Sequence, residues 1–119
     1  MRVAKDVFKT AIGISILFVT QIVHAQTECV TPEAPVIPDG STASEQELVN
    51  TVGVFKAYQA DLVTYRDCLT TYEEDLGDDI TDDQRAQMIT NYNDSVDSEE
   101  TLAVELNEAI QDFRAASGG

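Results

Sequence analysis

The sequence predicts an all-α fold, an antiparallel two-helix hairpin of the coiled-coil kind with an N-terminal proline-rich extended arm docked on it by a disulfide bond. Two long apolar stripes follow the three- and four-residue spacing of a helix, and a capping signature precedes each stripe. Of the two cysteines, Cys29 lies beside the proline-rich stretch and Cys68 lies within the first apolar stripe. A connection of about five residues makes the two helices antiparallel neighbours.

The first helix is predicted over residues 44–76. Ser44 and Glu47 match a capping box, in which each side chain accepts a hydrogen bond from the backbone N–H of the other residue. Gly77 suits the end of the helix, because glycine readily takes the left-handed conformation found there. Apolar side chains recur between these two ends at Leu48, Val52, Phe55, Tyr58, Leu62, Tyr65, Leu69, Tyr72 and Leu76.

The second helix is predicted over residues 82–116, before a frayed tail at 117–119. Thr81 and Gln84 form its capping box. Weak helix formers surround Asp97, which could cap a separate third helix, so a break near Asp97 is the alternative to one long helix. We favour one helix, because the apolar stripe keeps its phase on both sides, at Ile89, Tyr92, Val96, Ala103, Leu106, Ile110 and Phe113.

Residues 1–25 have the organisation of a cleaved signal peptide. Basic residues at positions 2, 5 and 9 precede an apolar stretch over 11–19, and Val23 and Ala25 suit the peptidase site. An uncleaved anchor is the alternative, but the stretch is shorter than the roughly 20 residues of a spanning helix. The residues before Cys29 do not fit a lipoprotein signal. We therefore expect an exported protein of the periplasm, or a secreted one, with no stable membrane anchor after cleavage.

The mature chain is strongly acidic. Cleavage removes three of the 7 basic and one of the 22 acidic residues, which leaves 4 and 21 and a net charge of −17. This charge repels nucleic acid and anionic lipid, so neither is expected as a partner.

The two cysteines predict a structural disulfide, because an exported chain reaches an oxidising compartment. A zinc site is the alternative, but two cysteines without a histidine make a poor one, since His24 lies in the signal peptide. Catalytic redox pairs usually stand much closer together in the sequence. Closing a loop of this length stabilises a fold by about 3 to 4 kcal/mol in the chain-entropy account.

The arm, residues 26–43, has prolines at 32, 35 and 38, which is the repeat of a polyproline II helix. From Ser44, Cys68 lies about 36 Å along the helix, and the extended arm spans about 46 Å. The arm can therefore turn at Asp39-Gly40 and run back to Cys68, covering a groove between the helices. A flexible linker and a ligand for a proline-reading domain are the alternatives.

A set of motifs extends over nearly all of the mature chain: Cys29, Pro32, Pro35, Pro38-Asp39-Gly40, Ala43-Ser44, Lys56-Ala57-Tyr58, Cys68, Tyr92-Asn93 and Leu106-Asn107. In these motifs the chain resembles a family of small uncharacterised exported proteins of Gram-negative bacteria, whose late motif has phenylalanine where this chain has Leu106. The resemblance supports the disulfide and the hairpin and implies no activity.

Catalysis is not expected, and no cofactor is predicted. The mature chain has no histidine, no free thiol if the disulfide forms and no glycine-rich phosphate loop. The expected function is that of a structural or interaction protein acting through helical surfaces, with a second copy or another periplasmic protein as partner.

Two local features carry the remaining hypotheses. Tyr58, Tyr65 and Tyr72 are seven residues apart and share one edge of the first helix, where they are core residues or, if exposed, an interaction edge. Acidic residues crowd the hairpin tip and make weak candidates for a calcium site at Asp78, Asp79, Asp82 and Asp83. Low-affinity binding of a divalent cation at the tip is therefore the alternative function.

Overall fold

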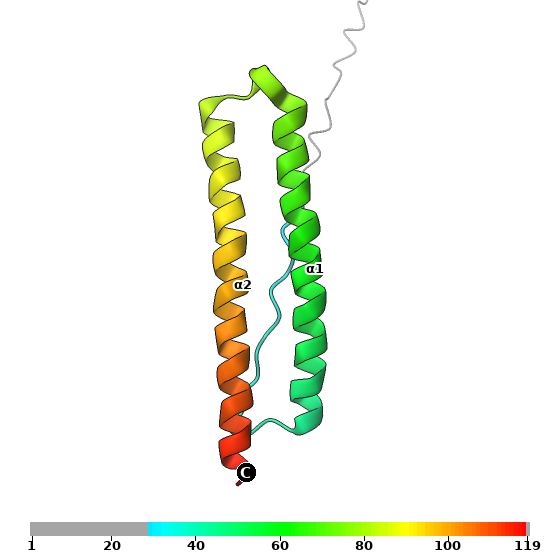
Figure 1. The fold of residues 1–119 in the computed structure, drawn as a ribbon, viewed down its shortest axis with the longest axis vertical. Coiled ribbons are helices and arrows are strands. Elements are labelled where there is room, and N and C mark those ends of the chain that lie inside the picture. The colour runs from blue at the N-terminus through cyan, green and yellow to red at the C-terminus, as the bar shows by residue number, and fades with distance from the viewer. Residues whose placement is uncertain (1–28, 119) are drawn as a thin grey trace, which may run out of the picture.

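The computed structural model describes residues 29–118. Helix α1 (Glu45–Leu76), the short 3₁₀ helix η1 (Gly77–Asp79) and helix α2 (Asp82–Ala116) follow one another, with no strand in this range. The two long helices lie side by side and antiparallel (Figure 1). The predicted all-α hairpin is confirmed, and the predicted signal peptide, residues 1–25, lies outside the described residues.

Both capping boxes form and begin the helices. The Glu47 N–H donates to Ser44 Oγ at 3.2 Å, and the Ser44 N–H donates to Glu47 Oε2 at 2.7 Å. Hydrogen bonding of the Glu47 carboxylate to the backbone and the side chain of Ser44 lowers the pKa of Glu47. In the second box, the Gln84 N–H donates to Thr81 Oγ1 at 3.1 Å, and the Thr81 N–H donates to Gln84 Oε1 at 2.9 Å. Gly77 ends α1 with a positive φ of 50°.

Helix α2 is continuous from Asp82 to Ala116, so no break occurs near Asp97. The favoured interpretation of one long helix is confirmed, and the alternative of a third helix is wrong. Packing against α1 along its length supplies the stability that the weak helix formers around Asp97 do not.

The core is the seam between the two helices. All nine positions of the predicted α1 stripe are buried or half-buried. The predicted α2 stripe is wrong in part, because Ile89, Tyr92 and Ala103 are exposed. The α2 residues that are buried follow a seven-residue repeat with one addition, Met88, Ser95, Leu102, Leu106 and Ala109. The buried row of α2 thus lies one residue before the row predicted from Ile89, Val96, Ala103 and Ile110. The polar Ser95 can be buried in it because Arg66 of α1 donates a hydrogen bond to its hydroxyl group.

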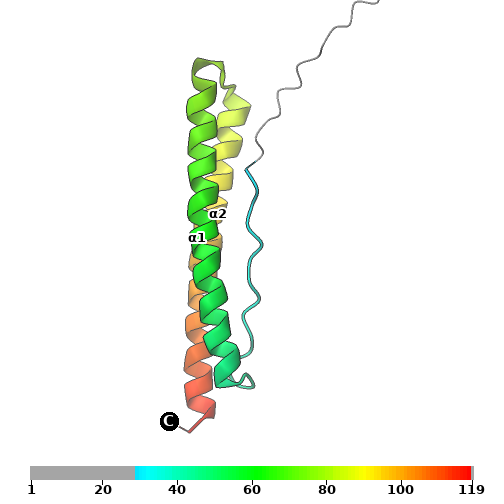
Figure 2. The same ribbon diagram turned by 90° about the vertical axis from the view of Figure 1, so that its right-hand side faces the viewer.

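The arm runs as an extended chain along one side of the hairpin (Figures 1 and 2). A disulfide joins Cys29 to Cys68, with 5.7 Å between their Cα atoms, so the predicted disulfide is confirmed. Ile37 packs against the core cluster around Phe55, Leu62 and Leu106. Within residues 29–118, no hydrogen bond joins positions 30–38 to either helix.

The arm turns at Asp39-Gly40, as predicted. The Ser41 N–H and hydroxyl donate to Asp39 Oδ1 at 2.9 and 2.6 Å, and the Ala43 N–H donates to the Asp39 carbonyl. Hydrogen bonds from the Ser41 side chain and backbone lower the pKa of Asp39. Gly40 is buried so closely against the Ala109 backbone that a Cβ at this position overlaps the Ala109 carbonyl oxygen.

None of the helices in residues 29–118 contains a stretch that is both long enough and apolar enough to cross a membrane.

Replacement of Gly40 by alanine is predicted to lower the free energy of unfolding by about 1 to 3 kcal/mol, because the new methyl group forces the arm away from Ala109. Gly53→Ala is the matched control. Position 53 lies in α1 with open space around it, so alanine there is expected to stabilise by about 0.5 to 1 kcal/mol. Urea unfolding followed by circular dichroism measures both. Equal effects of the two substitutions would contradict the close approach.

The variant Cys29→Ser/Cys68→Ser is predicted to lose about 3 to 4 kcal/mol of unfolding free energy, while both helices remain. Without hydrogen bonds to the helices, the arm should leave its groove and expose Tyr58 and Tyr65. Urea unfolding and the chemical shifts of the tyrosine rings report these two effects. The control is Val36→Ser, a change at an exposed arm position that keeps the disulfide. Unchanged ring environments in the cysteine-free variant would show that apolar contacts alone hold the arm.

Candidate functional site

The arm makes the two sides of the hairpin different. Figure 2 shows the hairpin from the side, with the arm along one of its faces. We call this side the arm-covered face and the opposite side the open face. Residues seven apart lie in one row along a helix packed in this way, so each face can be described by its rows.

On the arm-covered face, arm residues Thr31, Pro32 and Ala34 lie over the groove between α1 and α2. A hollow of about 290 Å³ remains beneath them, with Tyr58, Leu62 and Tyr65 in its wall. The Tyr58 hydroxyl and Ser98 Oγ share a hydrogen bond of 2.9 Å across this groove.

The tyrosine row therefore does not form an exposed edge. Tyr58 and Tyr65 are each only 5% exposed, and Tyr72 is half-buried. Of the row Tyr58, Tyr65 and Tyr72, the first two are core residues and form no exposed interaction edge. The arm closes the side of the groove to which this row belongs, which the helical pattern of α1 does not reveal.

The open face carries two rows that flank the seam. In α1 the row comprises Val49, Lys56, Val63 and Thr70, and in α2 it comprises Ile89, Val96, Ala103 and Ile110. Half or more of the surface of Val49, Val63 and Ile89 is exposed. The α2 row holds four of the seven residues of the predicted apolar stripe, so part of that stripe faces outward on this side of the hairpin.

Charge is distributed unequally between the two faces. The two open-face rows contain no acidic residue. The hollows beside the arm, in contrast, are lined by six carboxylates, Asp39, Asp61, Asp94, Glu105, Glu108 and Asp112. The two open-face rows are thus free of carboxylates on an acidic chain.

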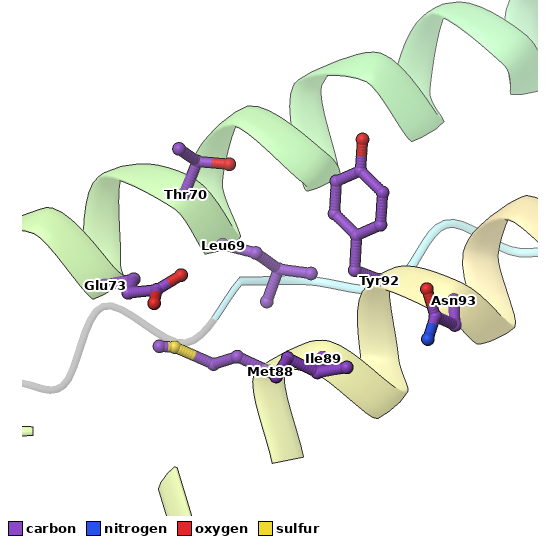
Figure 3. A pocket seen from close by; sticks show the side chains of 7 residues that line it. All are labelled: Leu69, Thr70, Glu73, Met88, Ile89, Tyr92 and Asn93. Atoms are coloured by element: carbon purple, nitrogen blue, oxygen red, sulfur yellow. The ribbon is translucent and has the colours of Figure 1, made fainter. Parts of the chain in front are cut away.

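A hollow of about 270 Å³ indents the half of the open face that is nearer the hairpin tip (Figure 3). Its apolar walls come from Leu69 of α1 and from Met88, Ile89 and Tyr92 of α2. The polar side chains of Thr70, Glu73 and Asn93 complete its rim. The hollow therefore suits an apolar side chain better than a charged ligand.

Arg66 joins α1 to α2 at the floor of the open face. Its Nε donates to Ser95 Oγ at 2.8 Å, and its Nη2 donates to the Ser95 carbonyl at 3.0 Å and to Glu99 Oε2 at 3.2 Å. The guanidinium also lies 5.9 Å from the centre of the Tyr92 ring. Only 15% of the Arg66 side chain and 23% of the Glu99 side chain are exposed.

This cluster is structural. Ser95 Oγ accepts from Arg66 and donates to the Tyr92 carbonyl at 2.6 Å, so its hydroxyl proton is engaged and no general base contacts it. No buried polar side chain within residues 29–118 lacks a hydrogen-bond partner. Sequence reasoning missed the cluster, but Glu99, an acid in an expected apolar slot, was the signal that could have indicated an arginine opposite.

The acidic tip does not assemble a metal site. Within residues 29–118, no three His, Cys, Asp or Glu side chains are placed to hold one ion together. Asp78 and Asp79 lie in η1, and Asp82 and Asp83 lie in the first turn of α2, where they favour the positive helix end. Glu73 nearby pairs with Arg85 at 3.2 Å. The cation-binding hypothesis thus has no ligand set in the part of the chain that the structure describes.

Comparison with known proteins gives no match: no protein-family model, curated protein or solved structure is similar to this chain.

Arg66→Met is predicted to lower the free energy of unfolding by about 1.5 to 3 kcal/mol, because it leaves the half-buried Glu99 and the buried Ser95 without the guanidinium that binds both. Arg85→Met is the matched control. Its pair with Glu73 has the same 3.2 Å distance but is about half exposed, so its loss should cost no more than about 1 kcal/mol. Urea unfolding of both variants measures the difference. A restored stability in Arg66→Met/Glu99→Leu would confirm that the unpaired carboxylate causes the loss.

Proposed function

We propose that this chain is a non-catalytic exported protein of the periplasm that acts by binding a protein surface through its open face. The observation that carries the proposal is the asymmetry of the hairpin. One groove is covered by an arm held by a disulfide, while the other keeps two uncovered rows with exposed apolar side chains.

The open face has the composition of an interface. Its rows are apolar at six of eight positions and lack acidic residues, and protein interfaces are depleted in charge at their centres. The hollow beside Ile89 and Tyr92 offers a place for an apolar side chain of the partner. Apolar side chains exposed around a hollow and rimmed by polar residues are typical of a binding site.

Two further features support export to the periplasm. The disulfide needs an oxidising compartment to form and persist. The N-terminal residues have the charge and hydropathy organisation of a signal peptide. Membership of the family of exported proteins that the sequence resembles stays a prediction.

A photoreactive amino acid placed at Ile89 in living cells is predicted to give a crosslinked protein product of defined mass. The same group at Val104 is the control, because Val104 lies on the same helix with similar exposure (58% against 55%) but outside the open-face rows. Illumination, affinity purification under denaturing conditions and mass spectrometry identify the products. Equal products from both positions, or none from Ile89, would contradict binding through the open face.

A further inference from the structure

We propose that the partner of the open face is the open face of a second copy, packed antiparallel about a two-fold axis to form a four-helix bundle. The proposal rests on the proposed function and names the partner of the same surface. The register of the two rows, the shape of the hollow and the distribution of charge support it.

The two open-face rows have the same length and lie at similar heights along the hairpin. The α1 row extends from Val49 to Thr70 and the α2 row from Ile89 to Ile110, so each spans 21 positions, and their midpoints lie near residues 59–60 and 99–100. The hydrogen bond between Tyr58 and Ser98 shows that these two residues are level, so the two midpoints differ in height by about three residues, or about 4.5 Å. A two-fold axis through the height of Tyr58 and Ser98, perpendicular to the helices, therefore brings each row onto its own copy to within about one helical turn.

This symmetry pairs side chains of complementary size. On α2, Val96 meets Ala103 of the second copy, and Ile89 meets Ile110. Each Ile110 is half-buried against its own core cluster, and its exposed part then lies beside the hollow of the second copy, which is lined by Leu69, Met88 and Tyr92. On α1, Val63 meets the aliphatic stem of Lys56, and the lysine ammonium group reaches solvent at the rim.

Charge decides between a second copy and a basic partner. All of the 22 acidic residues except Asp6 and Glu28 lie within residues 29–118, which contain 20 acidic and 4 basic residues. Two copies therefore repel each other over most of their surfaces. The open-face rows are free of carboxylates, and the two carboxylates that lie beside them on this face, Glu99 and Glu73, are paired with Arg66 and Arg85. The second copy therefore meets no unpaired carboxylate in these rows. A basic partner finds no carboxylate in these rows to pair with. The observations therefore favour a second copy.

Charge also fixes the direction of packing. A bundle with both tips at one end gathers the tip carboxylates of the two copies in one place, at Asp78, Asp79, Asp82 and Asp83 of each. The antiparallel arrangement places the tips at opposite ends of the bundle, one helix length apart. The α2 row beside the open-face row contains Asn93, Glu100, Asn107 and Arg114. The two-fold axis brings Glu100 close to Glu100 of the second copy.

The first test is sedimentation of the exported mature chain with its disulfide intact, over a range of concentrations. Wild type should form a dimer whose affinity rises with salt, because salt screens the repulsion between two acidic chains. Ile89→Glu should weaken the dimer by roughly tenfold or more, since it buries a carboxylate at the interface, and Val104→Glu should leave it nearly unchanged.

The outcomes separate this inference from the proposed function. A chain that is monomeric at all concentrations, while photocrosslinking at Ile89 captures a different protein, would overturn the dimer and support the interaction function. A dimer weakened equally by Ile89→Glu and Val104→Glu would place the contact elsewhere and overturn the inference. A monomer without any crosslink at Ile89 would overturn both.

The second test addresses the antiparallel geometry. Chains with a photoreactive group at Ala103, half of them isotopically heavy, should give mixed heavy–light products joined to the peptide that contains Val96. Products joined to the α1 segment around Lys56 would show instead a bundle with both tips at the same end and would overturn the antiparallel geometry. Glu100→Gln should tighten the dimer at low salt, because it removes the carboxylate pair near the axis; a weaker dimer would contradict the position of that axis.

Discussion

Two helices bury only the seam where they meet, and the grooves on either side of that seam stay open unless something else fills them. In this protein, a third element with no regular secondary structure fills one groove. Residues 30–38 make no hydrogen bond to either helix, so the arm depends on the Cys29–Cys68 disulfide, on the packing of Ile37 and on the fit of Gly40 against Ala109. The disulfide is therefore the interaction on which the burial of Tyr58 and Tyr65 depends.

The seam itself is not uniformly apolar. Arg66 crosses it to Ser95 and Glu99, and Tyr58 crosses it to Ser98, so five polar side chains of two helices meet near mid-length. These bonds add limited net stability, because desolvation of the charged groups offsets much of the attraction between them. Their geometry is specific, however, since a shift of one helix by a turn would leave Arg66 and Glu99 half-buried and unpaired. The cluster thus selects one register of α1 against α2.

The sequence was sufficient for the elements whose signals are local. Neighbouring residues determine both capping boxes, the α1 stripe and the turn at Asp39-Gly40. The disulfide followed from the oxidising compartment to which the signal peptide directs the chain, and from an arm long enough to reach Cys68. The parts that failed depend on contacts between distant residues. The α2 stripe was misplaced because α2 has two apolar rows one residue apart, and contacts with α1, among them the bond from Arg66 to Ser95, determine which of them is buried. Likewise, the burial of Tyr58 and Tyr65 depends on arm residues that precede the helix in the sequence and fold back over it.

The covered groove also limits how copies of this chain can assemble. A bare pair of helices has two equivalent apolar grooves, and units that associate through both of them build open-ended arrays. Here the arm and its disulfide occupy one groove, and the acidic side chains gathered along it oppose the approach of another acidic chain. Of the two grooves, the one on the open face is left for association. Because a two-fold contact uses the same patch on both partners, the proposed dimer consumes the open faces of both copies, and assembly stops at two chains.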